Sequence, residues 1–116
     1  MTTWAATVRW RDCADCLPHR TVAVLPPNGI AIQVTLALVS SAPPGWMRRI
    51  VWPPRIRSKD VVAGFEGLPT RIGVYQSYVL VGRYQTAVWA FFGRGRPSPS
   101  QLRAVNAELA AARIPS

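Results

Sequence analysis

The sequence predicts one mainly-β domain over residues 1–116, an antiparallel β-sandwich-like fold with a single C-terminal helix. Residues 30–38 alternate large apolar side chains with small or polar ones, which is typical of a half-buried strand. Residues 72–92 carry a second β pattern, and a helix-start signal follows it at residues 98–101. A chain of 116 residues is long enough to bury one core without obligatory cross-links.

The first predicted strand covers residues 21–25, and the Pro-Pro-Asn-Gly sequence of residues 26–29 forms the turn that follows it. Consecutive prolines end a strand because they lack the N–H that a ladder requires. The same reasoning predicts a further strand over residues 48–52, since two prolines follow it directly. Large apolar side chains share one face of the longer strand between these two: Ile30, Ile32, Val34, Leu36 and Leu38.

Residues 72–81 and 84–92 are predicted to pair as a hairpin around Gly82-Arg83, a two-residue turn of the type that begins with glycine. This turn fixes the register, with Val81 opposite Tyr84. Aromatic and β-branched residues then lie across from one another, as they do in stable sheets.

The predicted helix runs from about residue 99 to residue 113. Ser98 is the N-cap, Pro99 occupies the first helical position, and Gln101 completes a capping box. One narrow apolar stripe follows at helical spacing and should face the sheet: Leu102, Val105, Leu109 and Ala112.

The charge is strongly positive, with 14 Lys and Arg against 5 Asp and Glu and a formal net charge of +9. This balance favours a polyanionic partner, so nucleic-acid binding driven by net charge is one functional hypothesis. The basic residues are scattered and all but Lys59 are arginine, which is also typical of a coding bias. An apolar content of 49% and a charged content of only 16% predict that most of the chain is folded.

Targeting signals are not predicted in this sequence. No transmembrane segment is expected, because no apolar run reaches 18 residues. Residues 1–12 lack the basic start and apolar stretch of a signal peptide, so a chain that begins at Met1 would be cytoplasmic.

Both cysteines and the single histidine lie in one Cys-x-x-Cys-x-x-His stretch, formed by Cys13, Cys16 and His19. A disulfide or a pair of thiols is the favoured interpretation, because a structural zinc needs four ligands and these are three. A redox dithiol would need a helix directly after the second cysteine, where the sequence shows Pro18 and a predicted strand. The metal and redox hypotheses remain as weaker alternatives, and no cofactor is predicted.

Catalysis is not predicted. His19 is the one side chain whose ordinary pKa suits general base chemistry near neutral pH, and nothing in the sequence places a carboxylate beside it. No catalytic residue is therefore assigned, and the chain is expected not to be an enzyme.

A surface of tryptophan and arginine is the predicted binding site. Aromatic and arginine side chains alternate within residues 45–57, a pattern typical of protein hot spots and stacking platforms. Two more arginines precede the helix, where an anion could dock near its N-terminus. We therefore expect a non-catalytic interaction module that binds a protein partner or an anionic polymer, with the oligomeric state, including a homo-oligomer, left open. The expected contact residues are Trp46, Arg48, Arg49, Trp52, Arg94 and Arg96.

Three further motifs resemble those of an uncharacterised β-rich domain found in actinomycete proteins, many of them exported. These are the Leu-Pro-Pro-x-Gly-Ile turn at residues 25–30, the Gly-x-Glu-Gly loop at residues 64–67, and the Phe-Gly that precedes Pro-Ser and a short helix. A short Cys-x-x-Cys near the start is also similar. The resemblance implies a small β-rich domain with a helix. It also implies an extracytoplasmic setting, in which Cys13 and Cys16 would be oxidised.

Overall fold

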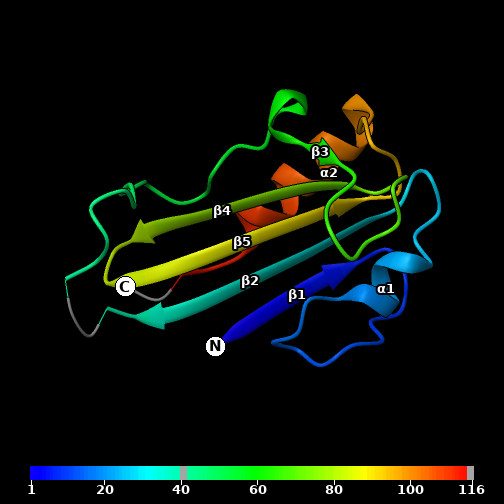
Figure 1. Ribbon diagram of the computed structural model, residues 1–116. Coiled ribbons are helices and arrows are strands. Elements are labelled where there is room, and N and C mark those ends of the chain that lie inside the picture. The colour runs from blue at the N-terminus through cyan, green and yellow to red at the C-terminus, as the bar shows by residue number, and fades with distance from the viewer. Residues whose placement is uncertain (40–41, 115–116) are drawn as a thin grey trace.

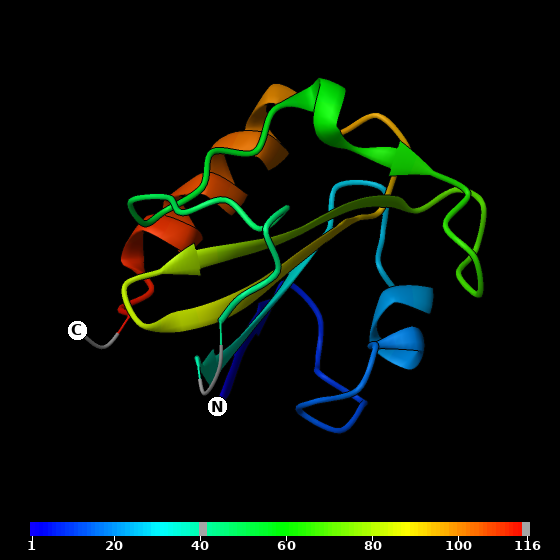
Figure 2. The same ribbon diagram turned by 60° about the vertical axis from the view of Figure 1, so that its left-hand side comes forward.

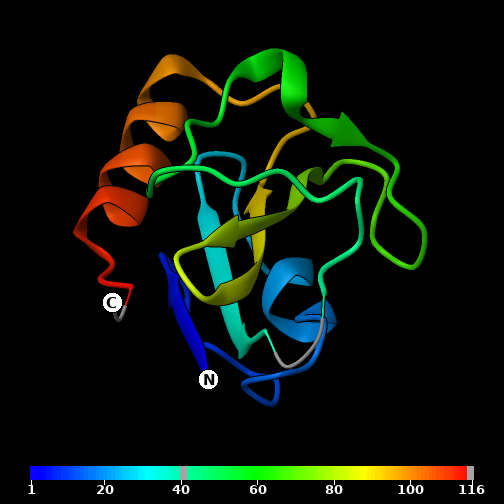
Figure 3. The same cartoon turned by 90° about the vertical axis from the view of Figure 1, so that its left-hand side faces the viewer.

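The computed structural model describes residues 1–39 and 42–114, whose strands form one antiparallel sheet in the order β1-β2-β5-β4-β3 (Figure 1). Helix α2 covers one face of this sheet, and helix α1 lies on the other side with the loop that precedes it (Figure 3). The elements follow the chain in this order: β1 (Thr2–Ala6), α1 (His19–Ala23), β2 (Ile30–Leu38), the 3-10 turn η1 (Ser58–Asp60), β3 (Val62–Ala63), β4 (Gly73–Val81), β5 (Tyr84–Phe92) and α2 (Pro99–Ala111).

The predicted fold class, mainly β and antiparallel with one C-terminal helix, is confirmed. The layers are those of a single sheet rather than of two facing sheets, since all the described strands join one ladder. Helices and loops therefore bury the two sheet faces, a task that a second sheet performs in a sandwich.

The central hairpin has the predicted register. Val81 pairs with Tyr84 and Gln76 with Trp89, and Gly82 has the positive φ of 57° that a turn beginning with glycine requires. The pairing starts one residue later than predicted, at Gly73. The turn was predictable because its two residues and both flanking patterns agree.

Each sheet face has its own apolar core. The α2 face buries the large apolar side chains predicted to share one face of β2, except Leu38, which is exposed at the strand end, together with Phe92, Val105 and Leu109. The α1 face buries Val22 and Phe91 with residues from the loops around them. Because successive residues of a strand point to opposite faces, neighbours such as Phe91 and Phe92 are fully buried in different cores.

Helix α2 begins as predicted and ends at Ala111, two residues before the expected position. The Ser98 hydroxyl accepts from the Gln101 N–H, and the Gln101 side chain accepts from the Ser98 N–H. The amide group of Gln101 also donates to the carbonyls of Pro27 and Gly29 at 2.9 and 3.0 Å. The capping box thus also ties the helix start to the turn before β2.

The strand predicted over residues 21–25 is wrong, because this segment lies in and just after the short helix α1. Thr21 and Val22 favour strands intrinsically, but both are fully buried against the sheet in helical conformation. The carboxylate of Asp12, from the preceding loop, accepts the N–H groups of Arg20 and Thr21. This cap from outside the helix overrides the local preference.

The strand predicted over residues 48–52 is also wrong. Only one parallel bridge forms there, between Arg49 and Leu80, and the following prolines prevent its extension. The two short edge strands, β1 and β3, were not predicted, since neither shows a period-two apolar pattern.

Candidate binding groove

The outer edge of β4 is only partly paired. At one end, the N–H of Leu80 donates to the Arg48 carbonyl at 2.8 Å, and the Leu80 carbonyl accepts from Ile50 at 2.9 Å. At the other end, Val62 and Ala63 of β3 pair with Val74 and Gly73. The chain between these two contacts, residues 51–61, leaves the strand edge and rejoins it at β3 (Figure 1 and Figure 2). A gap along β4 results.

Helix α2 holds this departing segment in place. The side chain of Asn106 accepts from the Ile56 N–H at 2.8 Å and donates to the Ile56 carbonyl at 3.0 Å. The Ile56 side chain is 1% exposed and enters the α2-face core. Its neighbours Arg55 and Arg57 are consequently exposed.

A groove of about 740 Å³, here called the β4 groove, lies between residues 48–60 and β4. Four cationic residues and one acidic residue line it: Arg48, Arg55, Arg57, Lys59 and Asp60. The Asp60 carboxylate accepts from the Arg57 N–H at 3.2 Å within the η1 turn. The Asp60 carboxylate is thus engaged within the η1 turn, while the four cationic residues are exposed.

Side chains of β4 form the floor of the β4 groove. Tyr75 and Val79 are buried, and Ser77 lies between them on the same strand face. The Ser77 hydroxyl oxygen is buried and has no hydrogen-bond partner among the described residues. A buried hydroxyl without a partner costs stability, and such groups often mark a place that another molecule or an ordered water completes.

A second groove, of about 850 Å³, lies on the other side of residues 53–57, along the first half of α2. We call it the α2 groove. It shares Arg55 and Arg57 with the β4 groove and adds Arg103. Arg48 and Lys59 line only the β4 groove, so substitutions at these two residues distinguish the sites.

The structure does not bring the predicted tryptophan–arginine surface together. Arg48 lines the β4 groove, and the nearby Trp46 is 68% exposed. The Arg49 guanidinium donates to the carbonyl of Gly82, in the turn at the start of β5. Arg94 and Arg96 follow the far end of β5 and are exposed. The nine residues of β5 separate the two groups by about 30 Å at the usual strand rise.

Trp52 has a structural position instead of a surface one. It is half-buried against the α2-face core. Its indole N–H donates to the carbonyls of Leu109 and Ala112 at 2.9 and 3.0 Å. These carbonyls belong to the last turn of α2 and its C-cap, so Trp52 closes the helix end.

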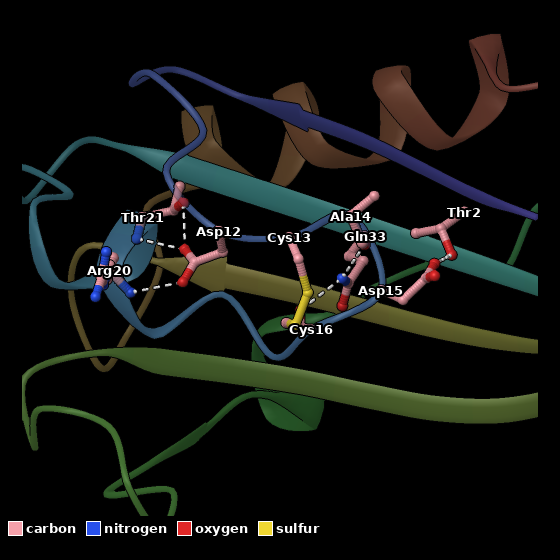
Figure 4. The surroundings of a disulfide bond; sticks show 9 residues. All are labelled: Thr2, Asp12, Cys13, Ala14, Asp15, Cys16, Arg20, Thr21 and Gln33. Carbon is pink, nitrogen blue, oxygen red and sulfur yellow. Dashed lines mark hydrogen bonds between the residues drawn. A yellow bond between two sulfur atoms is a disulfide. The ribbon is translucent and has the colours of Figure 1, made fainter.

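Cys13 and Cys16 are joined by a disulfide within the exposed loop before α1 (Figure 4). The side chain of Gln33, from β2, donates to the carbonyls of Ala14 and Cys16, both at 2.8 Å. The Thr2 hydroxyl donates to the Asp15 carboxylate. Hydrogen bonds from β1 and β2 therefore hold the disulfide-bonded loop against the sheet.

Asp12, in the same loop, has a pKa below its ordinary value. Burial alone would raise the pKa, but hydrogen bonds from the Thr21 hydroxyl and from two backbone N–H groups outweigh it, with help from the Arg20 charge. The charged carboxylate occupies the N–H groups at the start of α1 (Figure 4). A helix therefore does follow Cys16, contrary to the sequence prediction, but the Asp12 carboxylate, and not a cysteine, accepts the N–H groups of its first turn.

His19 opens α1 and is exposed, with Nδ1 hydrogen-bonded to the Gly67 carbonyl at 3.0 Å. Among residues 1–39 and 42–114, no three His, Cys, Asp or Glu side chains lie where they could hold a metal ion together. The described helices also include none with the length and apolar character needed to cross a membrane.

Comparisons with known proteins identified no relative of this chain. No protein-family model, no curated protein and no solved structure matched this chain. The resemblance to the actinomycete domain therefore stays a prediction from its motifs.

Proposed function

We propose that this chain is a non-catalytic binding module that takes an anionic segment of a protein partner in the β4 groove. The observation that carries the proposal is the charge of that groove. Arg48, Arg55, Arg57 and Lys59 line it, and Asp60, the acidic residue beside them, is already engaged by backbone within η1. Converging cations of this kind attract carboxylates and set the orientation of a partner.

The neighbouring groups suit a protein partner better than a simple ion. The floor combines apolar surface from Tyr75 and Val79 with an unpaired Ser77 hydroxyl, and Trp46 is exposed close in sequence to Arg48. Arginine and aromatic side chains beside apolar surface are enriched in protein contact sites.

The test measures binding of fluorescein-labelled polyglutamate by fluorescence anisotropy at low and physiological salt. The double variant Arg48→Ala/Lys59→Ala should bind on the order of tenfold more weakly than the parent chain. The control Arg9→Ala/Arg113→Ala removes two exposed charges outside both grooves and should bind like the parent.

Equal weakening in both double variants would show diffuse attraction by net charge and would overturn the proposal. The same measurement with duplex DNA decides between classes of partner. If DNA binds more tightly than polyglutamate and depends on Arg48 and Lys59, the partner is a nucleic acid and the assignment to a protein partner is wrong.

A further inference from the structure

The backbone N–H and C=O groups of β4 alternate in direction, and this alternation decides which of them face the β4 groove. The two-residue turn makes Val81 and Tyr84 a hydrogen-bonded pair, so odd-numbered residues of β4 direct their N–H and C=O groups to β5. Even-numbered residues direct theirs outward. The bonds of Leu80 to Arg48 and Ile50 confirm this parity.

Within the part of the chain that the structure describes, two outward-facing residues of β4 have no backbone partner. Val74 is paired by β3 and Leu80 by the bridge at Arg49, which leaves Gln76 and Tyr78 between them. No described residue forms a backbone hydrogen bond with the outward N–H or C=O groups of these two. The open edge therefore presents two donors and two acceptors at strand spacing.

The groups around this open edge specify the side chains of a guest strand. On the α2 side of the sheet, a guest would meet the four cations that line the β4 groove. On the opposite side it would meet Gln76 and the half-exposed ring of Tyr78, whose side chains bond to each other at 2.8 Å. Since strand side chains alternate between faces, only every second guest residue would lie among the cations.

We propose that the β4 groove binds an extended acidic peptide segment that adds to the sheet as a strand beside Gln76 and Tyr78, with carboxylates at alternate positions. This inference rests on the proposed function, because it names how the same groove holds its anionic partner. Main-chain hydrogen bonds supply part of the affinity in such strand addition, and alternate side chains supply specificity. The gap between β3 and the Arg49 bridge limits the paired stretch to a few residues.

The first experiment uses a labelled peptide of alternating glutamate and valine, with capped ends, and a copy that is N-methylated at alternate residues. Methylation removes the donors that face β4 and keeps every charge. The unmodified peptide should bind, and the methylated copy should bind on the order of tenfold more weakly. A peptide with lysine in place of glutamate should not bind.

The second experiment changes the protein. Gln76→Pro removes an outward N–H while leaving the bonds between β4 and β5, and proline is tolerated at such edge positions. This variant should lose affinity for the peptide to about the same extent as methylation, and it should lose more than Gln76→Ala, which removes the same side chain but keeps the backbone N–H. In the parent chain, amide exchange at Gln76 and Tyr78 should slow when the peptide is added.

The outcomes separate the two proposals. If the methylated and unmodified peptides bind equally, and exchange at Gln76 and Tyr78 does not change, strand addition is wrong while the anionic binding site stands. If no acidic probe depends on Arg48 and Lys59, the proposed function fails and strand addition fails with it. The peptide arm needs no protein variant, so it decides the matter even where Gln76→Pro does not fold.

Discussion

Replacing Gln101 tests how the start of α2 is fastened to the sheet. The side chain is 4% exposed and makes three hydrogen bonds: one from the Ser98 N–H and two to the carbonyls of Pro27 and Gly29. A typical hydrogen bond contributes about 1 kcal/mol net, so Gln101→Ala should lower the free energy of unfolding by about 3 kcal/mol. Ser98→Ala removes only the cap and should cost about 1 kcal/mol.

The isosteric variant Gln101→Glu gives a sharper test, because it replaces the donating NH₂ group of the side chain with an oxygen that can only accept when the carboxyl group is ionised. Its carboxylate keeps the acceptor for the Ser98 N–H but places negative charge against the carbonyls of Pro27 and Gly29. This contact raises the pKa of the introduced carboxyl group above the unfolded value of about 4.3. Between the unfolded pKa and the raised folded pKa, the folded state binds more protons than the unfolded state. The free energy of unfolding of the variant, relative to the parent chain, therefore falls as pH rises through this range.

Urea denaturation followed by tryptophan fluorescence, repeated at several pH values, measures both effects. Gln101→Glu should be at least as unstable as Gln101→Ala at pH ~7 and should recover relative to the parent chain below pH ~4. A Gln101→Glu chain as stable as the parent at neutral pH would refute the assigned direction of these hydrogen bonds. Indistinguishable costs for Gln101→Ala and Ser98→Ala would refute the link to Pro27 and Gly29.

Two further predictions concern single side chains. Asp12→Asn removes the negative charge and one of the two oxygens that accept from Arg20 and Thr21, and should destabilise the chain by about 1 kcal/mol at neutral pH. Because the pKa of Asp12 is lowered in the folded state, this stabilisation is present above the unfolded pKa of 3.8 and is lost as pH falls through the folded pKa, so unfolding curves of parent and variant should converge in acid. A difference that persists unchanged in strong acid would contradict the cause assigned. Trp52→Phe keeps an aromatic ring but removes the donor to Leu109 and Ala112, and should cost about 1 kcal/mol and speed amide exchange in the last turn of α2. Exchange that accelerates equally along the whole helix would instead indicate lost packing.

The elements that could be predicted are those whose signals are local. The hairpin around Gly82 and the start of α2 each combine a periodic pattern with a turn or cap written in neighbouring residues, and both are confirmed. The segment that became α1 shows the opposite case. Its helix depends on Asp12, which lies outside it, and on burial of Thr21 and Val22 against the sheet. Propensity alone predicts a strand there, because it contains no information about distant partners.

The same distinction applies to the candidate site. The alternation of aromatic and arginine residues within residues 45–57 indicated a functional segment, and Arg48 does line the β4 groove. Gln76, Ser77 and Tyr78 were assigned no binding role, because an open strand edge depends on the sheet order and on where neighbouring strands stop. Trp52 was placed on the surface, since nothing in its own segment signals that the end of α2 lies above it.

The position of the cations beside the open edge of β4 has a consequence for specificity. An unpaired edge is a template for any extended chain, including another copy of the same protein. Two copies that approach through this edge would bring Arg48, Arg55, Arg57 and Lys59 of each against one another, and like charges at such contacts oppose pairing. An acidic strand meets attraction at the same place. If the β4 groove binds as proposed, one set of side chains both opposes self-association through this edge and selects an anionic partner.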